Sequence, residues 1–282
     1  MKFRLLVSVV LPLSIISTMS AYAQQSFRPA SPQELCGTPR PTPTERQTIR
    51  SLIERVEREA ALRTEALVAA VEVPVYVWVI RNGTTASNVP RADIDEMIRN
   101  LNQAFSGTRF SFRLAETRQI RNDAWYRMIS GSAAERKAKR QLRRGGRESL
   151  NIWTAYCGVS EEGNIINGYA RWSGSRHGVV IRPNRVRTTT AIHEAAHWFF
   201  IWHTFEDGCV SPHGGDDVAD TSAQRSSTSG CPNRRDSCRS LAGDDPIHNY
   251  MDYSTCRYEF TAGQRRRMDA LWNPLRLAPA PQ

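Results

Sequence analysis

The sequence predicts an α+β protein whose C-terminal part depends on disulfide bonds. Strand and helix patterns alternate as far as residue 205, after which the pattern dissolves into loops until one last helix. Four of the six cysteines fall in residues 209–256, a stretch rich in Gly, Ser, Asp and Pro that could not hold its shape by core burial alone. At 282 residues, with 40% hydrophobic and 23% charged side chains, the chain can bury a substantial core, which argues against wholesale disorder.

The N-terminus has the pattern of an export signal. Two basic residues precede an apolar run, and Ala21–Ala23 fits the small-x-small rule for signal peptidase cleavage, so residues 1–23 are expected to be removed. A retained membrane anchor is the alternative, but the run contains Pro12 and is short for a span of about 20 apolar residues. We expect a soluble, secreted protein without a membrane partner, extracellular or, in a Gram-negative host, periplasmic.

The next elements follow from side-chain periodicity. Residues 24–44 are polar and rich in proline, which predicts an extended leader. Residues 44–67 carry apolar side chains on one helical face and form either the first helix of the domain or part of a short pro-segment. Residues 71–80 alternate and are rich in β-branched and aromatic side chains, which predicts a strand, and residues 92–105 have helical spacing.

The remaining elements include one strongly basic segment. The formal net charge is +10, and much of the excess lies in residues 135–149. A nucleic-acid site would favour such a run, but no aromatic residues are interleaved and no nucleic-acid-binding motif accompanies it. A solvated helical face is therefore favoured, and no nucleic-acid partner is expected. Further strands are predicted at 110–117, 150–157, 168–172 and 177–182, and a final helix at 260–272.

Three of the six histidines lie close together, in the stretch HEAAHWFFIWH. His193, Glu194 and His197 have the H-E-x-x-H spacing of a zinc metalloprotease helix. Four residues apart on an α-helix, the two imidazoles point from the same face and can hold one Zn²⁺ at about 2.0–2.1 Å. Glu194 lies beside them, near enough to take a proton from a water on the zinc. A helix with hydrogen-bonded histidines is the structural alternative.

His203 can be a third ligand only if the helix breaks. A helix that continued for ten residues would carry it roughly 15 Å from His193, so the chain must turn back near residue 200. Glycine usually makes this turn because it accepts a positive φ, but Phe200 stands there. A bulky residue in the left-handed region costs about 1–2 kcal/mol. That strain is small beside the roughly 10 kcal/mol of a structural zinc site, so a three-histidine site is still expected.

The sequence after the histidine helix points to a family. The stretch from His193 to Phe205, followed by GDDVADT, GCPNRRDSC, GDDPIHNYMDYSTC and FTAGQRRRM, resembles the pappalysin-like metzincin zinc proteases, especially their secreted microbial members. Upstream, LRRGG, GYA and GVVI continue the likeness, which covers most of the chain beyond residue 70. The resemblance implies an upper mixed β-sheet with backing and active-site helices. It also implies an irregular, disulfide-stapled lower part with a Met-turn and a C-terminal helix.

The resemblance further implies roles for individual residues, the zinc ligands being His193, His197 and His203. Glu194 would be the general base on the zinc-bound water. Met251 would form the Met-turn beneath the metal, whereas without the resemblance it is plain core packing. Tyr253 would help to stabilise the oxyanion, with a packed surface tyrosine as the alternative. The substrate would lie extended along an edge strand, for which GYARW or its neighbour is the candidate.

The six cysteines all lie beyond the signal, and an even number in an oxidising compartment favours pairing. Zinc ligation by the last four is disfavoured because their spacings give no C-x-x-C pair. The resemblance implies the pairs Cys209–Cys238 and Cys231–Cys256. Cys36 and Cys157 either pair with each other, which the even count favours, or Cys36 caps the zinc as a latency thiolate.

An acidic turn lies after the histidine helix. Asp216, Asp217 and Asp220 offer the oxygen ligands that Ca²⁺ takes, and the resemblance implies that calcium binds there in some relatives. A turn held by its own backbone hydrogen bonds is the alternative. His177, His213 and His248 have no partner at ligand spacing and are expected to be surface or hydrogen-bonding residues.

The expected organisation has four parts: a signal peptide at 1–23, a leader and helix at 24–70, a catalytic domain at 71–275 and a flexible tail at 276–282. The expected function is that of a secreted zinc endopeptidase acting on proteins or peptides. A catalytically weak or inactive zinc-binding module of the same fold is the alternative, motivated by Phe200. The oligomeric state does not follow from the sequence.

Overall fold

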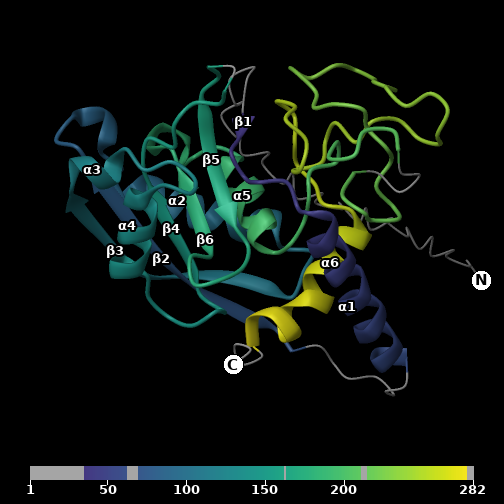
Figure 1. Cartoon of the computed structure of the whole chain (residues 1–282), viewed down its shortest axis with the longest axis horizontal. Helices are drawn as coiled ribbons and strands as arrows, with labels where there is room; N and C mark the ends of the chain where they lie inside the picture. Colours follow the sequence, from purple (N-terminus) through teal and green to yellow (C-terminus); the bar gives the residue numbers. More distant parts are fainter. Residues whose placement is uncertain (1–34, 62–68, 162, 211–214, 278–282) are drawn as a thin grey trace, which may run out of the picture.

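The computed structural model describes residues 35–61, 69–161, 163–210 and 215–277 (Figure 1). The expected signal peptide, most of the leader and the end of the expected tail lie outside these ranges. Within them, no helix has both the length and the apolar composition that a membrane span requires. The strands and most helices form one side of the molecule in Figure 1, and the loops of the C-terminal third, coloured green to yellow, form the other.

Six strands form one mixed sheet in the order β1–β5–β6–β4–β2–β3. β5 is antiparallel to β6, and the other neighbouring pairs are parallel. The strands are β1 Leu35–Cys36, β2 Val71–Arg81, β3 Phe110–Arg121, β4 Leu150–Thr154, β5 Ile166–Arg171 and β6 Gly178–Ile181. The five predicted strands are all present, and the predicted α+β fold with a mixed sheet is confirmed.

Helices cover both faces of the sheet, and the alternation along β2 explains why. Val75, Val77 and Val79 join a buried cluster with α2 and α5, whereas Trp78 and Ile80 join a second cluster with α3 and α4. The α-helices are α1 Pro43–Ala61, α2 Arg91–Ala104, α3 Asp123–Tyr126, α4 Ala133–Leu142, α5 Thr190–Trp198 and α6 Ala262–Trp272. Short turns of other helix types are η1 Thr85–Ser87, η2 Pro183–Arg185 and η3 Asn273–Leu277.

β1 is a strand that the sequence did not predict. Leu35 and Cys36 pair with Ile166 and Gly168 of β5, and Figure 1 shows β1 beside that strand. The backbone N–H of Gly37 continues the pairing by donating to Gly168 O at 2.8 Å. The outer edge of β5 offers backbone groups that an extended segment can pair with. Pairing between segments so far apart leaves no local pattern, which is why the sequence predicted only an extended leader.

The basic segment has the predicted solvated face, with Arg136, Lys137 and Arg140 exposed, but it also has a buried side. In α4, Glu135 and Lys139 are fully buried and form an ion pair of 2.8 Å. The Lys139 ammonium also lies over the rings of Trp153 and Tyr169, at 5.1 and 5.5 Å. Burial lowers the pKa of Lys139 to about 8, although the nearby Glu135 opposes this shift. One turn of the helix thus faces inward, because an acid and a base four residues apart satisfy each other there.

The lower part of the molecule consists mainly of loops between α5 and α6. Its disulfides are Cys209–Cys238 and Cys231–Cys256, which confirms both predicted pairs. The favoured third pair is wrong, because Cys36 and Cys157 are both free thiols. Cys157 is buried in the cluster with α3 and α4, whereas β1 places Cys36 beside Glu194 of α5. The even number of cysteines therefore did not indicate a third disulfide.

α1 is firmly joined to the rest of the domain. A capping box starts it, since Glu45 N–H donates to Thr42 Oγ1 and the Glu45 carboxylate accepts from Thr42 N–H at 2.8 Å. Arg46 forms an ion pair of 3.0 Å with Asp217, in the lower part. Apolar side chains of α1 enter a buried cluster that we call the α1 cluster, made of Ile49, Leu52, Trp172, Phe200, Trp202 and Leu271.

Candidate metal centre

α5 positions the first two histidines. All nine residues of this helix are buried, and the small side chains of Ala195 and Ala196 allow it to pack closely against β5 and β6. His193 and His197 lie one turn apart on the same face, as their spacing predicted. Their ring centroids are 4.7 Å apart.

Phe200 makes the turn that glycine usually makes. Its φ is +66°, in the left-handed region. The N–H of Phe200 donates to His197 O at 2.9 Å and the N–H of Ile201 to Ala196 O at 3.0 Å, which together form a Schellman motif. The predicted break near residue 200 is therefore confirmed. The Phe200 side chain lies in the α1 cluster, and this packing offsets the strain of its backbone.

The turn brings the third histidine to the first two. His203 Nε2 lies 3.3 Å from His193 Nε2 and 3.0 Å from His197 Nε2. Nitrogen ligands at 2.0–2.1 Å from a tetrahedral zinc ion lie about 3.3 Å from each other. The spacing of the three imidazoles therefore fits zinc.

The opposite side of each ring is held by a hydrogen-bond acceptor. The three Nδ1 contacts are His193 to Tyr250 O at 2.7 Å, His197 to Ile201 O at 2.8 Å and His203 to Glu206 Oε2 at 2.8 Å. Because a neutral imidazole that donates through Nδ1 carries its lone pair on Nε2, three lone pairs converge on one point. Such an arrangement is repulsive by itself and favourable around a cation.

Electrostatics favour a neutral His193, a neutral His197 and a charged Glu206. Burial lowers the pKa of His193 and of His197 well below the usual histidine value, and the neighbouring imidazoles lower both further. Burial would raise the pKa of Glu206, but the hydrogen bond from His203 and the nearby arginines Arg40 and Arg46 hold it below its usual value. Glu206 thus orients His203, a role for which the sequence offered only an acid three residues after the histidine.

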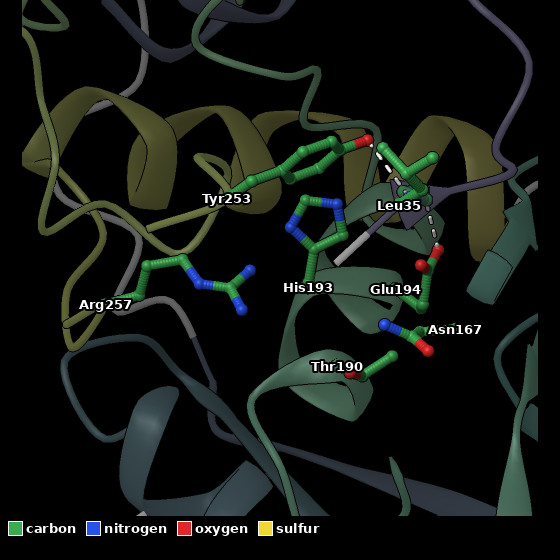
Figure 2. A pocket seen from close by; sticks show the side chains of 8 residues that line it. Leu35, Asn167, Thr190, His193, Glu194, Tyr253 and Arg257 are labelled. Carbon is green, nitrogen blue, oxygen red and sulfur yellow. Dashed lines mark hydrogen bonds between the residues drawn. The ribbon is translucent and has the colours of Figure 1, made fainter. Parts of the chain in front are cut away.

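Glu194 lies beside the histidines and faces the leader (Figure 2). Its Oε2 accepts a hydrogen bond from Thr38 Oγ1 at 2.9 Å and a contact from Cys36 Sγ at 3.4 Å. Gly168 of β5 leaves room for it, because a Cβ at that position would lie 2.9 Å from Glu194 Cγ. The absence of a side chain at residue 168 therefore allows the carboxylate to lie between α5 and β5.

The other two predicted residues lie on the lower side. The Tyr253 hydroxyl is 3.3 Å from His203 Nε2 and accepts a hydrogen bond from the Cys36 N–H at 3.1 Å. Burial raises the pKa of Tyr253 well above its usual value, so the phenol keeps its proton. Met251 is fully buried, and its backbone carbonyl accepts a hydrogen bond from Thr204 N–H, next to the third histidine.

Cys36 lies beside the three histidines, which agrees with the less favoured of the two alternatives for this residue. Within the described ranges, the only group of three or more potential metal ligands contains Cys36, His193, His197 and His203. Their ligand atoms all lie within 4.8 Å of one another. A thiol and three imidazoles are side chains that zinc accepts in tetrahedral sites, so the leader brings a fourth potential ligand to the three histidines.

The three aspartates of the acidic turn face different partners. Asp216 accepts hydrogen bonds from Gln264 Nε2 and Val218 N–H, and burial raises its pKa to about 7. Asp217 pairs with arginines of α1, and Asp220 accepts a hydrogen bond from Gly263 N–H. The structure does not gather these three carboxylates around one point.

The other histidines do not approach the centre. His177 is buried and accepts a hydrogen bond from Trp198 Nε1 at 3.0 Å. His248 contacts Cys256 O through Nδ1 at 2.9 Å. His213 lies outside the described residues.

Comparison with known proteins gives consistent matches. The family model for pregnancy-associated plasma protein-A, peptidase M43, matches residues 181–273. An extracellular metalloprotease of Neurospora crassa is 38% identical over 263 residues, which cover 86% of this chain and 88% of the relative. An extracellular metalloprotease of Podospora anserina is 36% identical over 293 residues, which cover 93% and 98%.

Solved structures match as well. Mature mirolysin of Tannerella forsythia, in complex with a cleaved peptide, has a TM-score of 0.58 and 25% identity, covering 72% of this chain and 92% of mirolysin. A mutant of promirolysin from the same organism has a TM-score of 0.61 and covers 83% and 91%. At 24% identity the second likeness concerns the fold alone.

Proposed function

This chain belongs to the M43 (pappalysin) family of extracellular zinc metalloproteases, and from that premise we propose which residues carry out its reaction. His193, His197 and His203 hold the zinc ion, and Glu194 is the general base. The observation that carries this proposal is the convergence of the three Nε2 atoms, with that of His203 lying 3.3 Å from that of His193 and 3.0 Å from that of His197. The Nδ1 atom of each ring contacts a hydrogen-bond acceptor. The substrates are proteins or peptides.

A bound zinc ion would supply Lewis acidity toward the scissile carbonyl group and the attacking water. Glu194 takes the proton of that water and delivers it to the amine that leaves. Its position supports this role, because the carboxylate lies beside His193 and faces the strand edge where a peptide would lie. Tyr253, protonated and close to His203, donates a hydrogen bond to the oxyanion.

β5 is the proposed docking strand for the substrate. Once β1 is absent, β5 is the edge of the sheet next to Glu194. The leader already uses this edge, since Gly37 N–H donates to Gly168 O and Thr38 Oγ1 accepts from Ala170 N–H. An extended substrate would make similar main-chain hydrogen bonds there.

The leader is proposed to keep the enzyme latent. Cys36 reaches the three histidines and Thr38 binds Glu194, so one short segment occupies both the fourth ligand position and the base. The leader upstream of α1 therefore acts as a pro-segment. The α1 helix stays with the catalytic domain, as its buried cluster and its ion pairs with Asp217 support.

Calcium at Asp216, Asp217 and Asp220 stays a prediction, and the arrangement counts against it. Each carboxylate already has protein donors or cations, which an ion would have to displace. Equilibrium dialysis with Ca²⁺ would measure such binding directly.

The experiment for this proposal compares mature wild type with Glu194→Ala. Both proteins should bind one zinc ion per chain, and the variant should cleave a denatured protein about 10²–10⁴-fold more slowly. Glu72→Ala, an exposed acid on β2, is the matched control and should retain wild-type activity. Full activity in Glu194→Ala would overturn the assignment of the base. A zinc-loaded wild type without activity would favour the inactive zinc-binding module.

A further inference from the structure

A small pocket lies directly beside Glu194 and His193 (Figure 2). Two of its lining residues, Leu35 and Cys36, belong to the leader, so the pocket widens when the leader leaves. The permanent part of the wall includes the proposed base and a proposed zinc ligand. A substrate side chain in this pocket therefore belongs to a residue next to the scissile bond.

Arg257 carries a positive charge to the wall of this pocket. It is 4% exposed, and Figure 2 shows its guanidinium group pointing toward the His193 ring. Nη1 donates to Asp252 O at 2.9 Å and Nη2 to Thr189 Oγ1 at 2.7 Å. These bonds tie the guanidinium to the Met-turn segment on one side and to the start of α5 on the other. Its position is thus fixed before a substrate arrives, which lowers the entropic cost of binding an anion.

Asn167 adds a second, independent observation. This residue of β5 is 2% exposed and lines the pocket on the side opposite Arg257 (Figure 2). Its Oδ1 accepts a hydrogen bond from Arg185 Nε at 3.2 Å, which sets the orientation of the amide. Among the described residues, Nδ2 has no hydrogen-bond partner. A buried amide donor of this kind requires an acceptor, and an entering substrate can supply one.

We propose that this pocket selects a carboxylate on the residue next to the scissile bond, and that Arg257 determines this specificity. The inference rests on the proposed function of the site. A guanidinium and an amide donor both favour an anionic acceptor, and the same guanidinium repels a lysine or arginine side chain. The substrate side chains that the pocket would select are therefore those of Asp and Glu. A free C-terminal carboxylate of a peptide has the same chemistry and must be distinguished by experiment.

The first test measures selectivity of the mature, zinc-loaded wild type. Peptides acetylated and amidated at their ends carry Glu, Gln, Lys or Leu immediately before the cleaved bond in one series and immediately after it in another. In one of the two series, kcat/KM for Glu should exceed that for Gln about tenfold or more, as a charge-assisted contact in the transition state supports. Lys should be the poorest residue there. One further peptide has a free C-terminal carboxylate on the residue next to the bond. Faster cleavage of this peptide than of its amidated form, without a preference for Glu over Gln, would show selection of a terminal carboxylate and overturn the assignment to side chains.

The second test assigns the selectivity to Arg257. Arg257→Gln should bring the Glu-to-Gln ratio of kcat/KM close to one, and Arg257→Lys should retain a preference for Glu. Because the ratio is internal to each protein, a general loss of activity or stability does not affect it. Arg234→Gln is the matched control, an exposed arginine of the same lower region that pairs with Asp244, and should keep the wild-type ratio.

Three outcomes would overturn the inference. They are a wild type that prefers Leu or Lys in both series, a wild type without preference, and an Arg257→Gln variant that still prefers Glu. Cleavage with any of these results leaves the proposed function intact, because Glu194→Ala tests that separately. Cleavage of no peptide and no protein by the zinc-loaded wild type would overturn the proposed function and this inference with it.

Discussion

At the scale of single residues, Phe200 answers the main objection that the sequence raised against a three-histidine site. Its backbone makes the left-handed turn that glycine usually makes, and its side chain is buried in the α1 cluster. The guanidinium of Arg276 lies over its ring at 4.7 Å and over the Trp198 ring at 4.1 Å. The left-handed backbone of Phe200 therefore destabilises the fold, and the burial of its side chain stabilises it.

Phe200→Gly should separate these two effects. Glycine relieves about 1–2 kcal/mol of left-handed strain, but the variant loses a buried aromatic side chain, a change that costs about 3–5 kcal/mol. The free energy of unfolding should fall by roughly 1–4 kcal/mol in denaturant titrations. Zinc affinity measured by chelator competition should stay within about threefold, because glycine preserves the turn.

Phe200→Ala is the control for this prediction. Alanine keeps the strain and loses the packing, so it should be less stable than the glycine variant. A glycine variant as stable as wild type would show that the packing of Phe200 contributes nothing. A large loss of zinc affinity in the glycine variant, with the fold intact, would show that the ring positions His203.

At the scale of elements, the leader and α1 have different relations to the centre. β1 pairs with β5 and delivers Cys36 and Thr38 to the reactive groups, through contacts that a substrate would replace. α1 instead buries apolar side chains that nothing would replace if it left. The segment expected as one unit at 24–70 is therefore proposed to divide between these two elements, after Thr38 and before the start of α1 at Pro43. N-terminal sequencing of the mature enzyme locates that cut.

Cys36→Ser should weaken latency in the uncut protein. Serine is a poorer zinc ligand than a thiolate, so the leader would be held less tightly over the site. Peptidase activity of the full-length variant should exceed that of full-length wild type by about tenfold or more, which corresponds to only 1.4 kcal/mol of lost leader binding. Cys157→Ser, at the other free thiol, is the control and should remain latent. Equal activity of the Cys36 variant and wild type would contradict the role of the thiol.

At the scale of the whole molecule, the upper part is held by a buried sheet and the lower part by disulfides. Cys231–Cys256 ends next to Arg257 and three residues after Tyr253, whereas Cys209–Cys238 begins in the loop after His203. The two disulfides close loops of similar length, with sequence separations of 29 and 25, and each contributes about 3.5 kcal/mol in the chain-entropy model.

Removal of either disulfide should therefore lower the melting temperature by a similar amount, but the effects on activity should differ. The double variant Cys231→Ala, Cys256→Ala loosens the segment that carries Tyr253 and Arg257, so its kcat/KM should fall more than that of Cys209→Ala, Cys238→Ala. Calorimetry and peptide kinetics on both variants measure this. Equal losses of kcat/KM would show that the Met-turn segment is held in place without its own disulfide.

Local patterns in the sequence predicted most of the fold and the three histidines. The alternation of β2 and the spacing of His193 and His197 depend only on neighbouring residues, so they could be identified directly. The positions of Cys36 and Arg257 depend on how distant segments meet. No local pattern encodes the pairing of β1 with β5, and the buried Glu135–Lys139 pair of α4 looks in sequence like any solvated helix.

Arg276 contacts both the Phe200 ring and the end of α5, the helix that carries His193 and His197. Arg276 was expected to begin a flexible tail, yet it is 3% exposed and donates a hydrogen bond to Trp198 O, at the last turn of the helix that carries two of the histidines. Removal of Arg276 would thus disturb the end of α5 and the turn at Phe200 without altering His193, His197 or His203. A truncation that removes Arg276 should therefore lower stability, and residues 200 and 276 are best varied as a pair because they are in contact.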